Sequence, residues 1–205
     1  GLYHQKFKYP PETMLSHTFY ETHTAEFFDF YRQKLIVHGA KPNAAHLRLA
    51  ALEREGKCRA VVTQNIDGLH QAAGSKTVYE LHGSTLRNYC TRCGKFFPVQ
   101  FIEDAAGVGD GVPRCDECGG IVKPDVVLYE EGLDEETMEN AVHAIRGADT
   151  LIVGGTSLAV YPAAGLLRYF RGENLVVINK QPTPADAMAN LLIHDWPHAG
   201  PRCPR

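Results

Sequence analysis

Two short apolar runs enclose a helix-like segment in TLIVGGTSLAVYPAAGLLRYFRGENLVVIN, residues 150–179. The runs TLIVGG and LVVIN have the length of buried strands, and YPAAGLLRYFRG between them favours a helix. The order of strand, helix and strand is typical of a βαβ unit, whose two strands are parallel neighbours in one sheet. This stretch therefore predicts an α/β fold with a Rossmann-like parallel sheet covered by helices.

The same alternation of helices and strands extends through the rest of the chain. The segment 133–147 predicts a helix, because apolar residues recur at helical spacing: Met138, Ala141, Val142 and Ile145. Acidic residues occupy its first turn, and Gly147 ends the predicted helix. We also predict helices over 25–37 and over 41–57, the latter with Pro42 in its first turn, and strands over 58–63, 78–81 and 126–129.

The composition suits one globular domain, or one domain with a small insert, because 44% of the 205 residues are hydrophobic. The 21 basic and 24 acidic residues give a net charge of −3, which provides no electrostatic attraction to nucleic acid or to an anionic membrane. No apolar run has the length needed to span a bilayer, and no signal peptide is recognisable. We expect a cytoplasmic monomer with no nucleic-acid or membrane partner.

The segment 84–123 differs from its surroundings, because it holds four paired cysteines and the glycine-rich loop GVGDG. The tail WPHAGPRCPR, with three prolines and little apolar periodicity, is also atypical. We divide the chain into a helical module (1–40), a first Rossmann part (41–83), a small zinc-ribbon domain inserted at 84–123, a second Rossmann part (124–195) and an atypical tail (196–205).

The four paired cysteines predict a metal site. Cys90 and Cys93 form one C-x-x-C pair, Cys115 and Cys118 form a second, and each pair is followed by glycine. Four thiolates complete the tetrahedral coordination of zinc and leave no open position for a substrate. The spacing therefore predicts a structural zinc ion and not a catalytic one.

Polar residues or glycine follow four of the predicted strands. They are Gln64, Asn65 and Asp67 (with Ile66 between them) after 58–63, His82 after 78–81, Gly155, Thr156 and Ser157 after the strand that begins at residue 150, and Asn179 and Lys180 after the last strand. Ligands of parallel α/β sheets bind outside the carboxyl ends of the strands, so these residues are candidates for a binding site.

Each of these strand ends also has an ordinary structural explanation. Asn and Asp favour turns, Gly-Gly-Thr-Ser could combine a turn with a helix N-cap, and a histidine such as His82 often ends a strand. Gly-Gly-Thr-Ser before a helix could equally form a phosphate-binding loop. Asn179 stands where Rossmann-type sites place a polar residue that binds a ribose hydroxyl. Together the four ends indicate a nucleotide site, although no G-x-G-x-x-G is present and an ordinary dehydrogenase is disfavoured.

Several motifs, taken in order, resemble those of the sirtuins, the NAD-dependent protein deacylases, and the chain looks like a bacterial member. The motifs are TQNIDGLHQAAG, ELHGS, the two C-x-x-C pairs, KPDVVLYEE, GTSLAVYPAA and VVIN. The resemblance extends from Gly1 to about Asp195. It implies an NAD-dependent protein-lysine deacetylase that transfers acetyl from lysine to ADP-ribose, releases nicotinamide, uses NAD and zinc, and acts on acetylated lysine peptides or proteins.

The resemblance also implies roles for individual residues. His82 would be the general base on a ribose hydroxyl. The implied cofactor-binding residues are Asn65 and Asp67 at the nicotinamide ribose and carboxamide with Gln64 and Ile66 beside them, Thr156 and Ser157 at the phosphates with Gly155 before them, Asn179 at the adenosine ribose with Lys180 after it, and Asp195 near the adenine.

The same resemblance assigns the substrate side of the site. Val126, Val127 and Tyr129 would line the acyl-lysine tunnel, and the peptide would add as a strand beside VVLYE and SLAVY, with Leu158 and Val160 in the second. Family members that remove acidic acyl groups carry a Tyr-x-x-Arg pair, whereas here Lys34 stands three residues after Tyr31. We therefore expect acetyl or longer apolar acyl groups to be preferred over succinyl.

The chain departs from the family in two places. The family's first strand and glycine-rich NAD loop would lie upstream of Gly1, and the tail does not resemble the expected closing helix, so we interpret the chain as a partial sequence. Two alternatives remain: a truncated inactive product that acts at most as a zinc-ribbon binding module, and a protein ADP-ribosyltransferase. The set of polar strand ends favours the deacetylase, because a binding module has no need of them.

Overall fold

The computed structural model describes residues 9–194, which form two compact units. Unit 1 comprises residues 9–40, 65–68 and 82–132, and unit 2 comprises 41–64, 69–81 and 133–194. Both units are therefore built from segments that are distant in the sequence.

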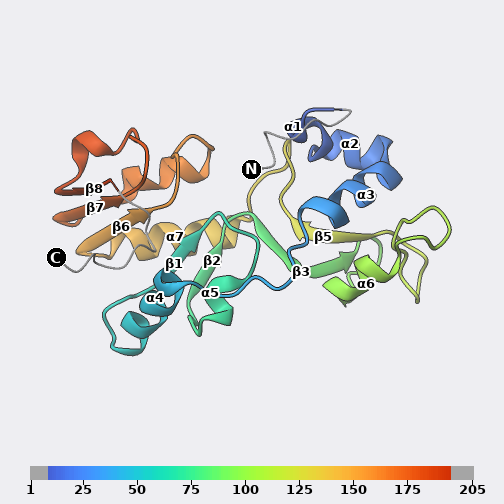
Figure 1. Cartoon of the computed structure of the whole chain (residues 1–205), viewed down its shortest axis with the longest axis horizontal. Helices are drawn as coiled ribbons and strands as arrows, with labels where there is room; N and C mark the ends of the chain where they lie inside the picture. Colours follow the sequence, from blue (N-terminus) through green and yellow to red (C-terminus); the bar gives the residue numbers. More distant parts are fainter. Residues whose placement is uncertain (1–8, 195–205) are drawn as a thin grey trace, which may run out of the picture. The chain divides into compact units, whose positions relative to one another are not determined.

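Unit 1 combines short helices with an antiparallel sheet (Figure 1). Its elements are α1 (Pro11–Met14), α2 (His17–Thr22), α3 (Thr24–Lys34), β3 (Gly83–Cys90), β4 (Phe96–Pro98), α6 (Val99–Asp104) and β5 (Val122–Val126). The sheet order is β4-β3-β5, and both pairings are antiparallel.

One aromatic core joins the N-terminal helices to the cysteine-containing segment. Phe27, Phe28 and Tyr31 of α3 are fully buried in the same cluster as Ile102 of α6 and Val122 of β5. The ring of Phe27 meets that of Phe28 edge to face at a centroid distance of 5.3 Å and stacks on that of Tyr31 at 5.8 Å, both within the range of favourable aromatic pairs. The helices thus form one wall of the core that supports the cysteine segment.

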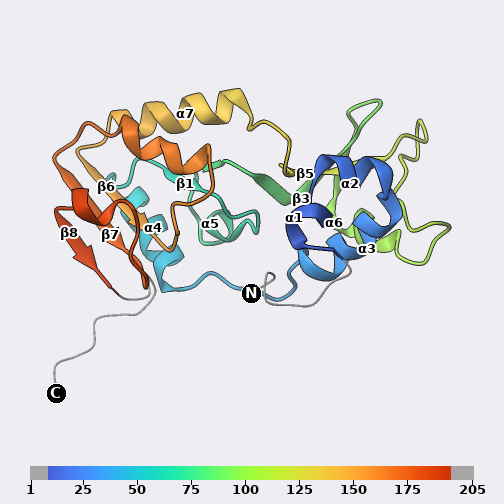
Figure 2. The same cartoon turned by 90° about the horizontal axis from the view of Figure 1, so that it is seen from above.

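Unit 2 contains the parallel strands predicted from the sequence (Figure 2). Its elements are α4 (Ala44–Arg54), β1 (Val61–Thr63), α5 (Leu69–Ala72), β2 (Val78–Glu80), α7 (Glu135–Arg146), β6 (Thr150–Gly154), the 3₁₀ helices η2 (Ala163–Tyr169) and η3 (Asp186–Met188), β7 (Asn174–Ile178) and β8 (Leu191–Ile193). The parallel strands form two sheets, β1-β2 and β6-β7-β8, and the α/β fold class is confirmed.

The two longest helices of unit 2 begin at side-chain caps. Asn43 caps α4, since its Oδ1 accepts the backbone N–H groups of Ala45 and His46 at 3.0 and 3.2 Å. Pro42 therefore precedes the cap, and the prediction that it lies in the first turn is wrong. Asp134 caps α7 through the N–H of Thr137 at 2.8 Å.

The structure differs from the sequence-based prediction in several further elements: the helix predicted over 25–37 is α3 and ends at Lys34, and the short elements α1, α2, α5, α6 and β4 were not predicted. The segment 161–172 is helical only over residues 163–169, as a 3₁₀ helix that follows Pro162 as its N-cap, and Gly165 within it disfavours a continuous α-helix. The predicted strand 126–129 is wrong beyond Val126, where β5 ends and a turn begins. Strand β8, which pairs with β7, was not predicted.

Within the described range 9–194, the helices are all too short or too polar to cross a membrane.

Candidate functional site

His82 lies directly before β3 of unit 1, and backbone contacts hold its position. Its carbonyl oxygen accepts the N–H of Val127 at 3.1 Å. The next residue, Gly83, has φ +73° and lies against the carbonyl of Asp125, where a β-carbon would overlap the oxygen. The glycine of the Leu-His-Gly sequence is therefore required by sterics, since it lets β3 approach β5 beside the histidine.

The loop that carries Asn65 and Asp67 is attached to the same strand. Both the N–H and the hydroxyl of Thr85 in β3 donate to the carbonyl of Ile66, at 3.0 and 3.1 Å. The side chain of Ile66 packs against the core of unit 1. Asn65 is exposed and Asp67 half-buried. The structure thus brings these predicted site residues to the strand that begins next to His82.

The segment that would line the acyl-lysine tunnel also belongs to unit 1. Val126 is buried at the end of β5, Val127 is half-buried, and 42% of Tyr129 is exposed. The N–H groups of Val127, Leu128 and Tyr129 donate to His82, Glu131 and Leu15 of the same chain. A peptide strand added along this segment would have to pair through other backbone groups.

In unit 2, the predicted phosphate and ribose residues lie at the carboxyl ends of adjacent parallel strands. Gly154 of β6 pairs with Ile178 of β7, and the N–H of Gly155 donates to the carbonyl of Ile178 at 3.1 Å. Asn179 follows β7, and its N–H donates to Ile193 of β8 at 3.0 Å. Residues 155–157 therefore follow one strand and Asn179 follows its parallel neighbour, as the βαβ pattern predicted.

The Gly-Gly-Thr-Ser segment is not followed directly by a helix. Thr156 accepts the N–H of Leu158 at 3.1 Å and so closes a turn, whereas η2 begins only at Ala163 with Pro162 as its N-cap. The N-cap explanation for Ser157 is wrong, and so is the argument that a helix end directly after it attracts phosphate. Backbone N–H groups and hydroxyls remain as the possible phosphate ligands of this segment.

The predicted site residues are divided between the two units. Unit 1 contains Asn65, Ile66, Asp67, His82, Val126, Val127 and Tyr129, and unit 2 contains Gln64, Gly155, Thr156, Ser157, Leu158, Val160, Asn179 and Lys180. Asp195 and the tail 196–205 lie outside the described residues.

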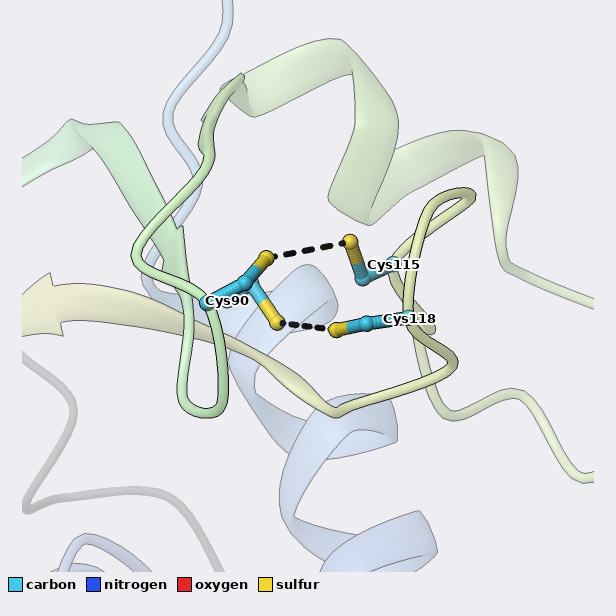
Figure 3. A group of neighbouring side chains, drawn as sticks. Cys90, Cys115 and Cys118 are labelled. Atoms are coloured by element: carbon cyan, nitrogen blue, oxygen red, sulfur yellow. Dashed lines mark hydrogen bonds between the residues drawn. The ribbon is translucent and has the colours of Figure 1, made fainter.

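The four paired cysteines converge on one point of unit 1 (Figure 3). Their sulfur atoms lie within 4.8 Å of one another, with Cys90 and Cys118 separated by 3.3 Å and Cys93 and Cys115 by 3.7 Å. Tetrahedral zinc with bonds of about 2.3 Å requires sulfur–sulfur distances of about 3.8 Å. The arrangement therefore fits a four-cysteine zinc centre.

The two cysteine pairs have the same backbone geometry. In the first pair, the N–H of Gly94 donates to the carbonyl of Cys90 at 2.9 Å; in the second, Gly119 donates to Cys115 at 2.9 Å. Both glycines have positive φ, +73° and +69°. Two equivalent turns thus present their sulfur atoms to a common centre, which explains the glycine after each pair.

Neighbouring groups favour a thiolate at Cys90 and hold the two turns together. Although burial opposes ionisation, backbone N–H groups directed at its sulfur lower the pKa of Cys90 to about 6, whereas contacts with neighbouring cysteine sulfurs raise the pKa of Cys93 and Cys118. Lys95 of the first turn donates to Asp116 and Glu117 of the second, at 2.8 Å each. A β-carbon on Gly120 would come within 2.9 Å of the Cys90 sulfur, so this position requires glycine.

The sequence-based analysis did not identify Lys95, Gly120, Thr85 or Glu131. Opposite charges on the two cysteine turns were a usable signal for Lys95. A glycine beyond the second C-x-x-C-G was a weaker signal for Gly120. Thr85 and Glu131 act through contacts with residues 19 and 114 positions away, which no local pattern reveals.

The fold and the metal centre define an α/β protein with a four-cysteine module, and comparison with known proteins gives its family. Residues 1–162 match the Sir2 family, and the chain belongs to this family. It is similar to an NAD-dependent protein deacetylase of Clostridium acetobutylicum, with 62% identity over 197 residues, which are 95% of this chain and 79% of that protein. A second such deacetylase, from Clostridium perfringens, is 58% identical over 95% of this chain and 80% of that protein.

Solved structures of the same family have a similar fold. A Sir2 bound to acetylated peptide superimposes with a TM-score of 0.86 at 38% identity, covering 94% of this chain and 82% of that one. A Sir2 complex with p53 peptide and NAD⁺ gives a TM-score of 0.85 at 38% identity, with the same coverage of each chain.

Proposed function

We propose that this member of the Sir2 family is an NAD-dependent protein-lysine deacetylase. The observation that carries the proposal is the hydrogen bond between the carbonyl of His82 and the N–H of Val127. It joins the candidate base to the segment that would contact the acyl-lysine. The same activity is named in relatives with 62% and 58% identity.

His82 is assigned the proton transfer. A neutral imidazole nitrogen can take a proton from a hydroxyl within hydrogen-bond reach, and a histidine suits this role near neutral pH. The steric fit of Gly83 against Asp125 and the hydrogen bond to Val127 hold the backbone of His82 in place. Fixing the histidine in this way supports catalysis because proton transfer depends on a short, oriented contact.

Asn65 and Asp67 are assigned to the nicotinamide ribose and carboxamide, with Gln64 and Ile66 as their neighbours in sequence. An amide and a carboxylate supply both the donors and the acceptors that these polar groups need. NAD, when bound, supplies the ADP-ribose that receives the acetyl group and the nicotinamide that leaves. The attachment of Ile66 to Thr85 supports this assignment, since it fixes the loop to β3.

The residues of unit 2 are assigned to the remainder of the dinucleotide. Thr156 and Ser157 offer backbone N–H groups and hydroxyls to phosphate, Gly155 anchors their segment through its N–H bond to Ile178, and Asn179, followed by Lys180, offers polar groups to the adenosine ribose. Their place after the neighbouring strands β6 and β7 supports the assignment. Asp195 is proposed for the adenine end from the family resemblance alone.

The acyl-lysine side of the site is assigned to two segments. Val126, Val127 and Tyr129 provide apolar and aromatic surface for the acyl chain in unit 1, and Leu158 and Val160 provide apolar side chains in unit 2. Tyr129 is 42% exposed and Val160 43%, so both have surface available for a ligand.

Zinc is assigned a structural role. All four sulfur atoms would be bound to the metal, so it could not also bind substrate. Cysteines without disulfides, as within residues 9–194, suit a reducing compartment, and we therefore place the protein in the cytoplasm; the monomeric state is proposed from the sequence alone.

The test is to incubate a form of the protein that spans the full length of its relatives with NAD and an acetyl-lysine peptide, and to identify the products by mass spectrometry. We expect deacetylated peptide, nicotinamide and O-acetyl-ADP-ribose. The His82→Ala variant should retain NAD binding and lose roughly 10²- to 10⁴-fold in rate, the usual contribution of a general base. Transfer of ADP-ribose onto protein without deacetylation, or peptide binding without turnover, would refute the proposal.

A further inference from the structure

The carboxylate of Glu131 joins three parts of unit 1 at the turn formed by residues 127–131. Its Oε2 accepts the N–H of Leu128 at 2.8 Å and the ammonium of Lys123 at 3.2 Å, and its Oε1 lies 2.8 Å from Nδ1 of His17. Only 20% of the Glu131 side chain is exposed. One carboxylate thus connects the turn itself, strand β5 and the first residue of α2.

The backbone and a second carboxylate attach the same turn to α2. The N–H of His17 donates to the carbonyl of Tyr129 at 3.0 Å, and the N–H of Tyr129 donates to Leu15 at 3.0 Å. Oε2 of Glu130 accepts both the N–H and the hydroxyl of Thr18, at 2.9 and 2.8 Å. Glu130 has φ +76°, a conformation that residues with a side chain rarely adopt, so these contacts hold the turn in a strained form.

The turn carries the residues that the proposed function assigns to the acyl-lysine. Lys123, which binds Glu131, also donates to the carbonyl of Val126 at 3.2 Å. Val127 and Tyr129 lie inside the turn. A change in the contacts of Glu131 would therefore shift Val127 and Tyr129, which are proposed to contact the acyl-lysine.

We propose that Glu131, held by His17, is a positioning residue that sets the conformation of this turn and thereby the affinity for the acetyl-lysine peptide. This inference rests on the proposed deacetylase function. Glu131 acts through the turn and does not itself touch the reacting atoms.

The geometry also gives the contact a pH dependence. The ionisable groups around the contact of His17 with Glu131 are Glu21 and Tyr20 of α2 and Glu130 of the turn on the side of His17, and Lys123 of β5 on the side of Glu131. The hydrogen bond with Glu131 raises the pKa of His17 above its ordinary 6.5. Burial opposes ionisation of Glu131, but its hydrogen bonds lower its pKa below the ordinary 4.5.

The sign of the effect follows from these two directions. The charged contact is complete between about pH 4.5 and 6.5. It is lost as the pH rises through the raised pKa of His17, or falls through the lowered pKa of Glu131. Its contribution to peptide affinity should therefore decline above pH 6.5.

The first test compares Glu131→Gln with Glu21→Gln. Glu21 also contacts His17, at 3.2 Å, but within residues 9–194 it makes no hydrogen bond to the turn, so its substitution is the matched control. For Glu131→Gln we expect the KM for an acetyl-lysine peptide to rise roughly tenfold, the effect of losing one charge-assisted hydrogen bond, with kcat within about twofold. An unchanged KM, or a loss confined to kcat, would overturn the proposal.

The second test uses His17→Gln, which keeps a hydrogen-bond donor and removes the charge. The ratio of its KM to that of the wild type should be greatest near pH 6.5 and approach one at higher pH. A ratio that does not vary with pH would show that the charge of His17 has no part in positioning the turn.

A third readout does not require turnover. Hydrogen exchange of the amides of residues 127–131 should be faster in Glu131→Gln than in the wild type or Glu21→Gln, and anisotropy of a labelled acetyl-lysine peptide should report weaker binding. A raised KM without faster exchange would contradict positioning. If the wild type binds the peptide but never deacetylates it, the proposed function fails, and exchange and binding still decide the role of Glu131.

Discussion

Gly83 lies against the carbonyl oxygen of Asp125 so closely that no β-carbon fits between them. The contact occurs one residue after His82, where β3 begins, and it allows β3 to pair closely with β5 beside the candidate base. The identity of this residue thus controls where His82 is placed.

Gly83→Ala should therefore damage both stability and catalysis. The matched control is Gly107→Ala, because Gly107 has the same φ of +73° but no atom within 4 Å of its added β-carbon. Backbone strain alone should cost Gly107→Ala about 1 kcal/mol in the free energy of unfolding. Gly83→Ala should cost clearly more and reduce the deacetylation rate by at least roughly tenfold. Equal effects of the two substitutions in thermal unfolding and peptide assays would rule out the steric explanation.

Metal analysis should find one zinc ion per chain. Cys93→Ser removes one of four ligands and should lose the zinc, whereas Cys58→Ser, which changes a half-buried cysteine outside the cluster, should retain it. Because the cysteine segment shares its core with α3, zinc loss should lower the Tm by roughly 10 °C or more. A zinc-free wild type with an unchanged Tm would contradict the assignment.

Glu53 should make stability depend on pH. Its carboxylate accepts the N–H groups of Lys76 and Thr77 at 2.8 Å each, and these bonds lower its pKa below 4.5. The stabilisation is present above pH 4.5 and is lost as the pH falls through the lowered pKa of the folded state. Glu53→Gln should cost about 1 kcal/mol at pH 7 and remove this dependence. Chemical denaturation from pH 3 to 7 measures it.

Glu55→Gln provides the comparison for that experiment. Glu55 is an exposed neighbour paired with Lys57 and Arg48 at the surface. Surface pairs of this kind contribute little to stability, so its substitution should leave the denaturation midpoint unchanged. If both variants behave alike, the backbone contacts of Glu53 are not the cause.

The acyl group preferred should be acetyl or a longer apolar group. Tyr31 is fully buried in the aromatic core of unit 1 and Lys34 stands three residues later, so this stretch offers no exposed Tyr-x-x-Arg pair for a carboxylate. Paired peptides that differ only in the acyl group should give a higher kcat/KM for acetyl-lysine than for succinyl-lysine. A preference for succinyl-lysine would disprove the expectation.

Elements with local signals were predicted well from the sequence. The helix α7 has an Asp134 cap, an apolar stripe and Gly147 at its end, all of which depend on neighbouring residues. The four cysteines converge as their spacing indicated, and Gly155 and Asn179 follow adjacent parallel strands.

The remaining features depend on contacts between distant residues. Strand β5 stops at Val126 because Tyr129 pairs with Ser16, more than a hundred positions away, and because Glu131 takes the N–H of Leu128. No pattern in a single segment contains this information.

Strand β3 begins one residue after His82 and ends at Cys90. The candidate base and a metal ligand therefore lie at opposite ends of one continuous strand. The return strand, β5, likewise runs without interruption from the cysteine turns to Val126. The metal-binding segment is consequently not a cassette that can be exchanged between homologues at a loop. A chimera must transfer both strands together, with the glycine beside the histidine and the aromatic face of α3 that they pack against.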